Sequence, residues 1–291
     1  MDIDNKVNHL KVGELPTLMM VSKESLVFHE EPDRERLLNL VDRLGSEGAL
    51  KNPPIVARIK NGNQYVILDG ANRVTALTKL GFSHFLVQVV DFDDESLRLH
   101  CWNHAIEYLD RRYFEKNIRK AGNIEIIEDN SKNVSADNPP DFSKNEGTFC
   151  HLTFNGQGAF YIAGASDLIQ QVSILRKLTS LYLNAPDYDR VSYINLEHLK
   201  KHYPNFRTLA IFRRFQKEDF IRLTESGIKL PAGITRVFLP KRALGLNIPL
   251  EFLKSELTLE EKNRWLDEMI LKRVRDKSIR FYREPTFVFD E

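Results

Sequence analysis

The sequence predicts an α/β protein, of the α+β kind, built from two domains. The chain has 291 residues, more than one typical domain. Short apolar stretches with strand character alternate with segments that carry apolar residues at helical spacing. Between two such regions, residues 121–147 are poor in aromatic residues and rich in Asn, Asp, Ser, Pro and Lys. We therefore expect a first domain over 1–120, a linker or long surface loop over 121–147, and a second domain over 148–291.

The first domain is predicted to contain three helices and several short strands. The stretch LVFHE (26–30) is a short apolar strand, and Leu37, Leu40, Val41 and Leu44 follow at helical spacing before Gly45 and Gly48. PPIVARI and QYVILD flank a turn at Asn61-Gly62-Asn63, which predicts a hairpin. A helix over 72–80 that ends at Gly81, a strand in HFLVQVVDF and a helix over 94–118 complete this domain.

The second domain is predicted to mix strands and helices in the same way. In order, we expect strands near 149–154 and 159–163, a helix over 166–184, helical segments over 194–227, a strand in ITRVFLP and a final helix over 258–275.

Composition restricts the classes of function. Lys and Arg total 42 against 41 acidic residues, so net charge gives no general attraction to nucleic acid or to anionic membranes. No apolar run reaches the length of a membrane span, and the N-terminus MDIDNKVNHL lacks the layout of a signal peptide. We expect a soluble, cytoplasmic protein without a membrane partner. The two cysteines show neither a CxxC nor a Cys/His spacing, so local spacing indicates no zinc site.

One junction carries chemistry: the apolar strand before Asp69 runs through Gly70, Ala71, Asn72 and Arg73 directly into a helix. The first N–H groups of a helix lack partners within it, and an anion such as phosphate commonly binds there. Gly70 lets a ligand approach the backbone, and the Arg73 guanidinium can bind phosphate oxygens in a bidentate manner. Asp69 would repel a bare phosphate, so it is better explained as a ligand of Mg²⁺ or as a proton acceptor.

The alternative for this junction is an ordinary turn, in which Asp69 or Asn72 caps the helix and Arg73 is solvated. The GxxxxGK[ST] phosphate loop is absent from the sequence, which excludes the P-loop class of nucleotide sites.

The first domain resembles the ParB/sulfiredoxin-like nucleotide-binding domain over roughly residues 8–115. The likeness lies in a helix with a glycine-containing turn, then NPPIV, a hairpin, and a strand that runs into DGxxR with TAL behind it. Sulfiredoxins carry a catalytic cysteine in this turn, where this chain has Ala71 and Asn72. ParB proteins carry a GERRxxA-type version, whereas here the acidic residue precedes the glycine.

The sequence also resembles the free L-serine kinases of this superfamily, which have DGxHR where this chain has Asn72 in place of the histidine. Those kinases carry an HE pair whose glutamate is the proposed catalytic base, which by resemblance is Glu30. Without the resemblance, Glu30 would be interpreted as a surface acid, and Glu31 competes for the role. Trp102 and His104, in HCWNHA, resemble a segment of the same kinases that would orient a small amino acid; a buried tryptophan and a satisfied histidine are the alternative.

The resemblance continues into the second domain at LPAGITR (230–236) and the following VFLPKRALGLNIPLEFL. The kinases carry PAGxTR here, which implies that Thr235 and Arg236 bind the substrate's carboxylate or the phosphate in transfer. An arginine just after a glycine-containing turn also suits a bidentate anion contact, although a solvated arginine at a strand start is the plainer alternative. Some of these kinases have a histidine after this arginine, where this chain has Val237.

These observations lead to one preferred function and two alternatives. The resemblance implies a kinase that transfers a phosphoryl group from ATP or ADP to free L-serine, with Mg²⁺, in a cleft between a nucleotide-binding and a substrate-binding domain. The product, O-phospho-L-serine, would feed siderophore or cysteine-type biosynthesis. The first alternative, a less favoured ParB-like DNA-binding regulator, interprets residues 208–227 as a basic helix-turn-helix with Arg213, Arg214 and Lys217 on phosphates. The second is a family member that binds nucleotide without catalysis.

Overall fold

The computed structural model describes residues 12–282, 284 and 286, except for 60–62, 122–123, 131–133, 136–137, 145, 165–166 and 184–187. Asn61 and Gly62 of the predicted hairpin turn lie outside the described residues. No helix in the described part of the chain is both long enough and apolar enough to cross a bilayer.

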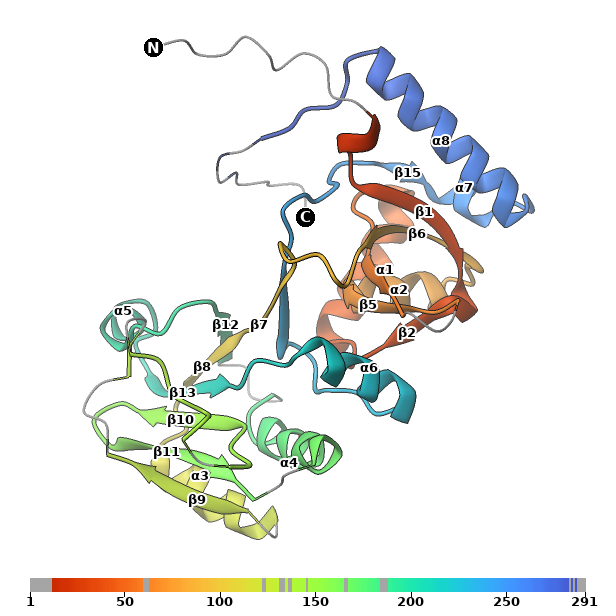
Figure 1. Ribbon diagram of the computed structural model, residues 1–291. Coiled ribbons are helices and arrows are strands. Elements are labelled where there is room, and N and C mark those ends of the chain that lie inside the picture. The colour runs from red at the N-terminus through yellow and green to blue at the C-terminus, as the bar shows by residue number, and fades with distance from the viewer. Residues whose placement is uncertain are drawn as a thin grey trace.

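The first sheet is mixed and has five strands (Figure 1). Its order is β1 (Thr17–Ser22), β6 (His84–Val90), β4 (Ile55–Arg58), β5 (Tyr65–Asp69) and β2 (Leu26–Phe28). The predicted hairpin is confirmed, because β4 and β5 pair antiparallel, while β2 lies parallel to β5 on the other side. Parallel pairing places the ends of β2 and β5 at the same edge of the sheet. His29-Glu30 and Asp69-Gly70 therefore emerge next to each other.

Two helices follow directly from sequence signals in this half. Helix α1 (Arg34–Glu47) starts at Asp33, whose carboxylate accepts a bond from the Arg36 N–H, and it ends at Gly48 with φ 64°. It continues through Gly45 because one glycine inside a helix costs only about 1 kcal/mol. Helix α2 (Ala71–Lys79) starts at Gly70, and Gly81 follows it with φ 84°. Both helices were predicted.

The second sheet has six antiparallel strands. Its order is β12 (Tyr188–Val191), β8 (Asn103–Glu107), β13 (Phe206–Phe212), β10 (Cys150–Phe154), β11 (Gly158–Ala163) and β9 (Glu125–Asp129). The strands at β10 and β11 and helix α4 (Leu168–Ser180) match the prediction. Strand β9 lies inside the segment 121–147, where composition predicted a linker or loop, and it pairs with β11 at the edge of the sheet.

The predicted helix over 94–118 is wrong in its first part. Residues 98–107 form β7 (Arg98–Cys101) and β8, and only α3 (Arg111–Ile118) is helical. Strand β7 pairs with β14 (Thr235–Phe238), and β8 lies between β12 and β13. These partners are far away in the sequence, so tertiary pairing decides the conformation rather than local periodicity.

The predicted helical run over 194–227 is also partly wrong. Helices α5 (Leu196–His202) and α6 (Lys217–Ser226) are present, but the residues between them form β13 in the middle of the sheet. A short, fully apolar run does not distinguish a buried strand from a buried helix. The helix-turn-helix interpretation of 208–227 is therefore wrong. In addition, Arg213 pairs with Asp219 at 3.1 Å and Lys217 with Asp93, so neither is held free for phosphate contacts.

The C-terminal part of the chain returns to the first sheet. Helices α7 (Leu250–Lys254) and α8 (Leu259–Arg275) pack against the first sheet. Just before α7, the short strand β15 (Ile248–Pro249) pairs with β3 (Ala49–Leu50). Asn263 of α8 bonds to both backbone groups of Met20 in β1, with distances of 2.8 and 3.0 Å. The predicted strand in ITRVFLP and the predicted final helix are confirmed as β14 and α8.

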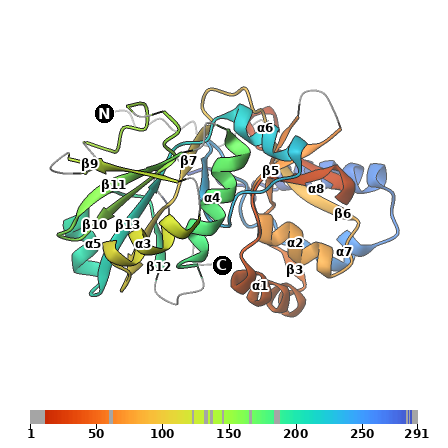
Figure 2. The same ribbon diagram turned by 90° about the horizontal axis from the view of Figure 1, so that it is seen from below.

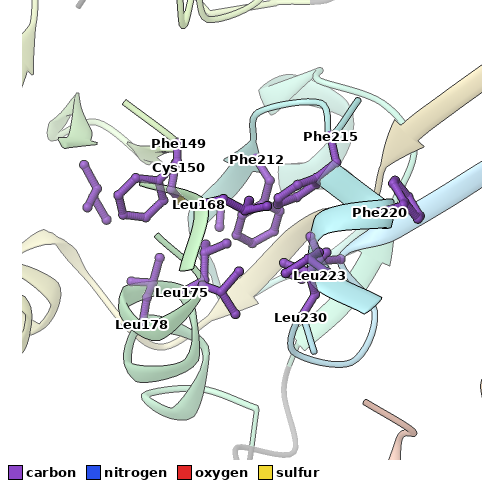
Figure 3. Packing of buried hydrophobic residues seen from close by; sticks show 14 of the residues in the cluster. Phe149, Cys150, Leu168, Leu175, Leu178, Phe212, Phe215, Phe220, Leu223 and Leu230 are labelled. Atoms are coloured by element: carbon purple, nitrogen blue, oxygen red, sulfur yellow. The ribbon is translucent and has the colours of Figure 1, made fainter. Parts of the chain in front are cut away.

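One hydrophobic cluster joins the two halves. It runs from β10, α4 and β13 to Phe220 and Leu223 of α6 and to Leu230 (Figure 3). The same cluster includes Val66 and Leu68 of β5 in the first sheet. Figure 2 shows α4 and α6 at the junction between the two sheets. The loop that carries PAGITR is thus packed against the edge at which β2 and β5 end.

Candidate active site

A pocket of about 690 Å³ opens where β2, β5 and the loop after Leu230 meet. This volume is in the range of small-molecule sites. Its lining comes from three stretches of chain: the end of β2 with α1, the β5–α2 turn, and the PAGITR loop with its neighbours. The residues are His29, Glu30, Glu31, Asp33, Arg36, Asn39, Leu40, Arg43, Ile67, Leu68, Asp69, Gly70, Ala71, Asn72, Arg73, Trp102, Arg190, Ala232, Gly233 and Thr235.

The β5–α2 turn requires glycine at position 70. Gly70 has φ 93°, and a Cβ there would lie 3.0 Å from the Pro54 backbone and side chain. An L side chain would be strained by both the dihedral and the contact. Gly70 precedes α2 and supplies no side-chain cap, and the first residues of this helix line the pocket. The Asp69 carboxylate accepts a hydrogen bond from the Gly70 N–H.

Asp69 lies between two arginines. Its carboxylate is 3.5 Å from the Arg73 guanidinium and is bonded by the Arg242 guanidinium. Burial opposes ionisation of this carboxyl, but Arg73 and Arg242 outweigh burial and lower the pKa of Asp69. The side chain is therefore a fixed negative charge.

Arg73 and Asn72 have structural partners in this turn. The Arg73 guanidinium donates to the carbonyls of Asn52 and Pro53, at 3.0 and 3.2 Å, and its side chain is only 17% exposed. Asn72 accepts a bond of 2.8 Å from the Asp33 N–H at the start of α1. Both residues line the pocket, and both also hold the turn against its neighbours.

Glu30 lines the same pocket as this turn and is held by the PAGITR loop. One carboxylate oxygen accepts from the Gly233 N–H at 2.7 Å, and the other accepts from the N–H and the hydroxyl of Thr235 at 2.8 and 2.6 Å. Burial raises the pKa of Glu30, while the bonds from Thr235 and Gly233 and the charge of Arg190 oppose that rise. The side chain is thus fixed in orientation and poised to exchange a proton.

His29, next to Glu30, lines the pocket but is only 3% exposed. Its Nδ1 lies 2.7 Å from the Ile67 carbonyl oxygen and its Nε2 lies 2.9 Å from the Thr235 hydroxyl. The ring packs on Phe220 of α6, with 4.3 Å between ring centroids. Burial lowers the pKa of His29 to about 4.

Trp102 and Arg236 meet at the mouth of the site. The Arg236 guanidinium lies 4.1 Å from the Trp102 ring centre and 4.4 Å from that of Phe238. A second hollow of about 360 Å³ includes both residues and also reaches Asp69 and Arg242. Trp102 belongs to both hollows, whereas Arg236 belongs to the second only.

His104 lies outside both hollows. It is fully buried on β8, with Nδ1 2.8 Å from the Tyr182 hydroxyl and Nε2 2.9 Å from the Gly233 carbonyl oxygen. Burial lowers the pKa of His104 to about 4. Of the predicted site residues, His104 alone is separated from the pocket surface, and it touches the site through Gly233.

Sequence reasoning missed Arg190. This arginine of β12 lines the pocket and pairs with Asp33 at 2.8 Å, with a side chain only 15% exposed. Its Nε is buried and has no hydrogen-bond partner within the described part of the chain. Gly233 is packed on it, because a Cβ at that position would lie 2.1 Å from Nε. No local signal in the sequence marks Arg190, because its position depends on the pairing of β12 with β8.

The pocket combines two carboxylates in opposite environments with an uncapped helix start. Carboxyl groups whose surroundings separate their pKa values commonly divide acid–base work and charge stabilisation between them. The residues that the structure describes contain no group of three or more His, Cys, Asp or Glu side chains arranged to hold a metal. Fold and pocket together define an α/β protein with a site for an anionic small molecule beside a buried carboxylate.

Comparison with known proteins shows which proteins this chain is similar to. No family model matches the chain. An ATP-dependent L-serine kinase of Staphylothermus marinus is 26% identical over 81% of this chain and 91% of its own length. The ADP-dependent L-serine kinase SerK of Thermococcus kodakarensis is 22% identical over 81% of this chain and 92% of its own. These matches cover most of both proteins, so the chain is similar to free L-serine kinases over most of its length.

Solved structures of such proteins share the fold. SbnI with a C-terminal truncation, from Staphylococcus aureus, superimposes with a TM-score of 0.69 over 88% of this chain and 96% of its own, at 17% identity. A free serine kinase in complex with AMP gives a TM-score of 0.65 over 85% of this chain and 96% of its own, at 19% identity.

Proposed function

We propose that this protein phosphorylates the hydroxyl of free L-serine, with ATP or ADP as donor, to give O-phospho-L-serine. The observation that carries the proposal is the meeting of Glu30 with the Asp69–Arg73 turn across one pocket. Phosphoryl transfer needs an acceptor hydroxyl beside a base and a phosphate held in line, and a carboxylate next to a helix start in one pocket suits both requirements. The relatives that match over most of their length are named as L-serine kinases.

We propose that Glu30 is the catalytic base. A free hydroxyl is a weak nucleophile, and a carboxylate against it removes the proton as the phosphoryl group arrives. Three hydrogen bonds from Gly233 and Thr235 fix this carboxylate. Oε1 accepts only the bond from Gly233, so one of its lone pairs remains to accept the serine proton. Glu31, the competing acid, pairs with Arg176 at 3.0 Å and its side chain is 46% exposed.

We propose that the nucleotide phosphates bind at Gly70, Ala71, Asn72 and Arg73. The uncapped start of α2 supplies N–H donors, and Gly70 lets the phosphates approach the backbone. The nucleoside then extends along α1, where Arg36, Asn39, Leu40 and Arg43 line the same pocket.

Magnesium is proposed to bind together with the nucleotide. Mg²⁺ is usually held by one or two carboxylates plus substrate phosphates, so a site without a cluster of acidic ligands fits it. Asp69 is the proposed ligand. It fits once Arg242, which is bonded to it here and has a side chain 37% exposed, turns toward the phosphates. The ion would neutralise phosphate charge, and Asp69 would fix its place beside the turn.

Serine is proposed to lie between Glu30 and Trp102, with Thr235 and Arg236 on the side of the PAGITR loop. The Thr235 hydroxyl is bonded to Glu30, so Thr235 acts on the substrate through that carboxylate. Arg236, stacked on Trp102, supplies the positive charge for the substrate carboxylate. His104 would support the loop through the Gly233 carbonyl.

We also propose that the two domains bind different ligands. Residues 1–120 would form a ParB/sulfiredoxin-like nucleotide-binding domain, and residues 148–291 the substrate-binding domain after the segment 121–147, with the active site in the cleft between them. Strand β8 belongs to the second sheet and α8 packs on the first sheet, so one element from each side of that division packs with the other half. The product would feed siderophore or cysteine-type biosynthesis.

The test is direct phosphorylation. Purified protein is incubated with L-serine, Mg²⁺ and either ATP or ADP, and O-phospho-L-serine is followed by ³¹P NMR and mass spectrometry. We expect product with at least one donor, and none when D-serine replaces L-serine or when EDTA is added. Nucleotide binding without product, measured by calorimetry, would instead support the alternative that the protein binds nucleotide without catalysis.

A further inference from the structure

A continuous hydrogen-bonded chain leads from the pocket into the protein interior. Glu30 lies 2.6 Å from the Thr235 hydroxyl, which lies 2.9 Å from Nε2 of His29. Nδ1 of His29 lies 2.7 Å from the Ile67 carbonyl oxygen. His29 is 3% exposed, so this chain ends in the interior and not in solvent.

The number of protons in this chain follows from its donors and acceptors. A carbonyl oxygen only accepts, so Nδ1 of His29 carries a proton and donates it to Ile67. With a neutral imidazole, Nε2 is then an acceptor, and so is a Glu30 carboxylate. The Thr235 hydroxyl has a single proton and cannot donate to both.

Both short contacts are satisfied only when one additional proton is present. The proton lies either on Glu30, which donates to Thr235 while Thr235 donates to His29, or on Nε2 of His29, with both bonds reversed. An unsatisfied contact between two acceptors in a buried site costs about 1–3 kcal/mol. The geometry therefore favours a pair that holds one proton in common.

We propose that Thr235 passes a proton between Glu30 and His29, so that His29 stores the proton whenever Glu30 acts as the base. This inference rests on the proposed function for its catalytic meaning, while the shared proton itself follows from the contacts alone. Because His29 and Thr235 act through Glu30, they are positioning residues.

The transfer balances without any other reactant. The O–H bond of Glu30 breaks as its proton binds the Thr235 oxygen, and the hydroxyl proton of Thr235 passes to Nε2 of His29. Glu30 is then a carboxylate, and it accepts the proton of the serine hydroxyl as the oxygen–phosphorus bond forms. Glu30, which lines the pocket, next releases that proton to solvent, and the proton on His29 returns through Thr235.

The surroundings of the pair are compatible with a shared proton. Burial raises the pKa of Glu30 and lowers the pKa of His29 to about 4, and both directions favour Glu30 over His29 as the location of the shared proton. Arg190 is the positive charge that acts on Glu30, and the half-buried Cys101 thiol lies near enough for Glu30 to raise its pKa. Phe220 packs on the imidazole, and only 3% of His29 is exposed.

The direction in which the titration midpoint of Glu30 moves in Thr235 variants tests the shared proton without an assay of activity. The carboxyl carbon of Glu30 is titrated by ¹³C NMR in the parent protein, in Thr235→Val and in Thr235→Ser. If the proton is shared, the hydroxyl stabilises the protonated pair, so the midpoint falls by about one pH unit in Thr235→Val and stays in place in Thr235→Ser. If Thr235 is only a donor to the carboxylate, its loss raises the midpoint, and this outcome, or no change, overturns the proposal.

Kinetics then test what the relay does. We expect Thr235→Val and His29→Gln each to lower kcat about 10²-fold with KM for serine nearly constant, and Thr235→Ser to keep the parent's pH–rate profile. If Thr235→Ser behaves as Thr235→Val does, or if KM rises as much as kcat falls, the hydroxyl has another role and the relay is rejected. Should His29→Gln fail to fold, the two Thr235 variants still decide the question. If the parent protein makes no phosphoserine, the proposed function fails, and the titration alone decides the shared proton.

Discussion

The two acidic walls of the pocket differ in what holds their carboxylates. Glu30 is bonded by uncharged donors, the N–H groups of Gly233 and Thr235 and the Thr235 hydroxyl, and burial raises its pKa. Asp69 lies beside two guanidinium groups, those of Arg73 and Arg242, and these together with the Gly70 N–H lower its pKa despite burial. Neutral donors orient a carboxylate and leave it able to take a proton, whereas cations fix it as a charge. The contrast supports the proposal that Glu30 transfers the proton and that Asp69 places charge.

The largest expected effect is at Glu30. We expect Glu30→Gln to lower kcat for phosphoserine formation about 10³-fold, equivalent to about 4 kcal/mol, because the amide retains the size but accepts no proton. Affinity for nucleotide, measured by calorimetry, should stay within about twofold, since Glu30 is not among the residues to which we assign the nucleotide phosphates.

Glu31 supplies the matched control for that variant. It is adjacent in sequence and is also a glutamate, but its side chain pairs with Arg176 at the rim. We expect Glu31→Gln to leave kcat within about twofold, because exposed ion pairs contribute little. Equal losses in both variants would mean that the Glu30 assignment is wrong.

The next largest effect should be at Asp69, and of a different kind. Asp69→Asn removes the charge that we assign to metal placement, so the Mg²⁺ concentration for half-maximal rate should rise about tenfold and kcat/KM for nucleotide should fall about 10²-fold, or about 3 kcal/mol. Phosphoserine formation is measured across a Mg²⁺ series. Glu30→Gln, measured in the same series, should keep the parent's Mg²⁺ midpoint. If the two variants change the midpoint equally, the contrast between the walls does not hold.

How far the sequence predicted this site depends on how local each signal is. The Asp69 wall follows from consecutive residues: a strand, a glycine with positive φ and a helix start within a few positions. Such a junction is visible without knowledge of the fold. The same holds for the β4–β5 hairpin and for α1 and α8, whose caps and apolar spacing lie within each segment.

The Glu30 wall depends on contacts that no local pattern contains. Its donors are about two hundred positions away, and Arg190 reaches the pocket only because β12 pairs with β8. Glu30 and Thr235 were identified through resemblance to a family, not through periodicity. The strands β7, β8 and β13 were mistaken for helices for the same reason: distant pairing decides their conformation. Even Arg73 has partners, the carbonyls of Asn52 and Pro53, that only the folded chain brings together.

The smallest expected effect concerns His104, the buried residue that contacts the Gly233 carbonyl behind Glu30. We expect this effect in the free energy of unfolding rather than in the catalytic rate. The neutral His104 ring accepts from the Tyr182 hydroxyl and donates to the Gly233 carbonyl, and burial lowers its pKa to about 4 from 6.5. Between these values the unfolded chain binds a proton that the folded protein does not. The free energy of unfolding therefore falls as pH decreases from about 6.5 to about 4, by about 1.4 kcal/mol per pH unit from this residue. His104→Gln should reduce the slope by that amount in urea unfolding between pH 5 and pH 6. An unchanged slope in His104→Gln would show that this histidine is already charged in the folded protein, and the neutral hydrogen bonds that position Gly233 against Glu30 would then need another arrangement.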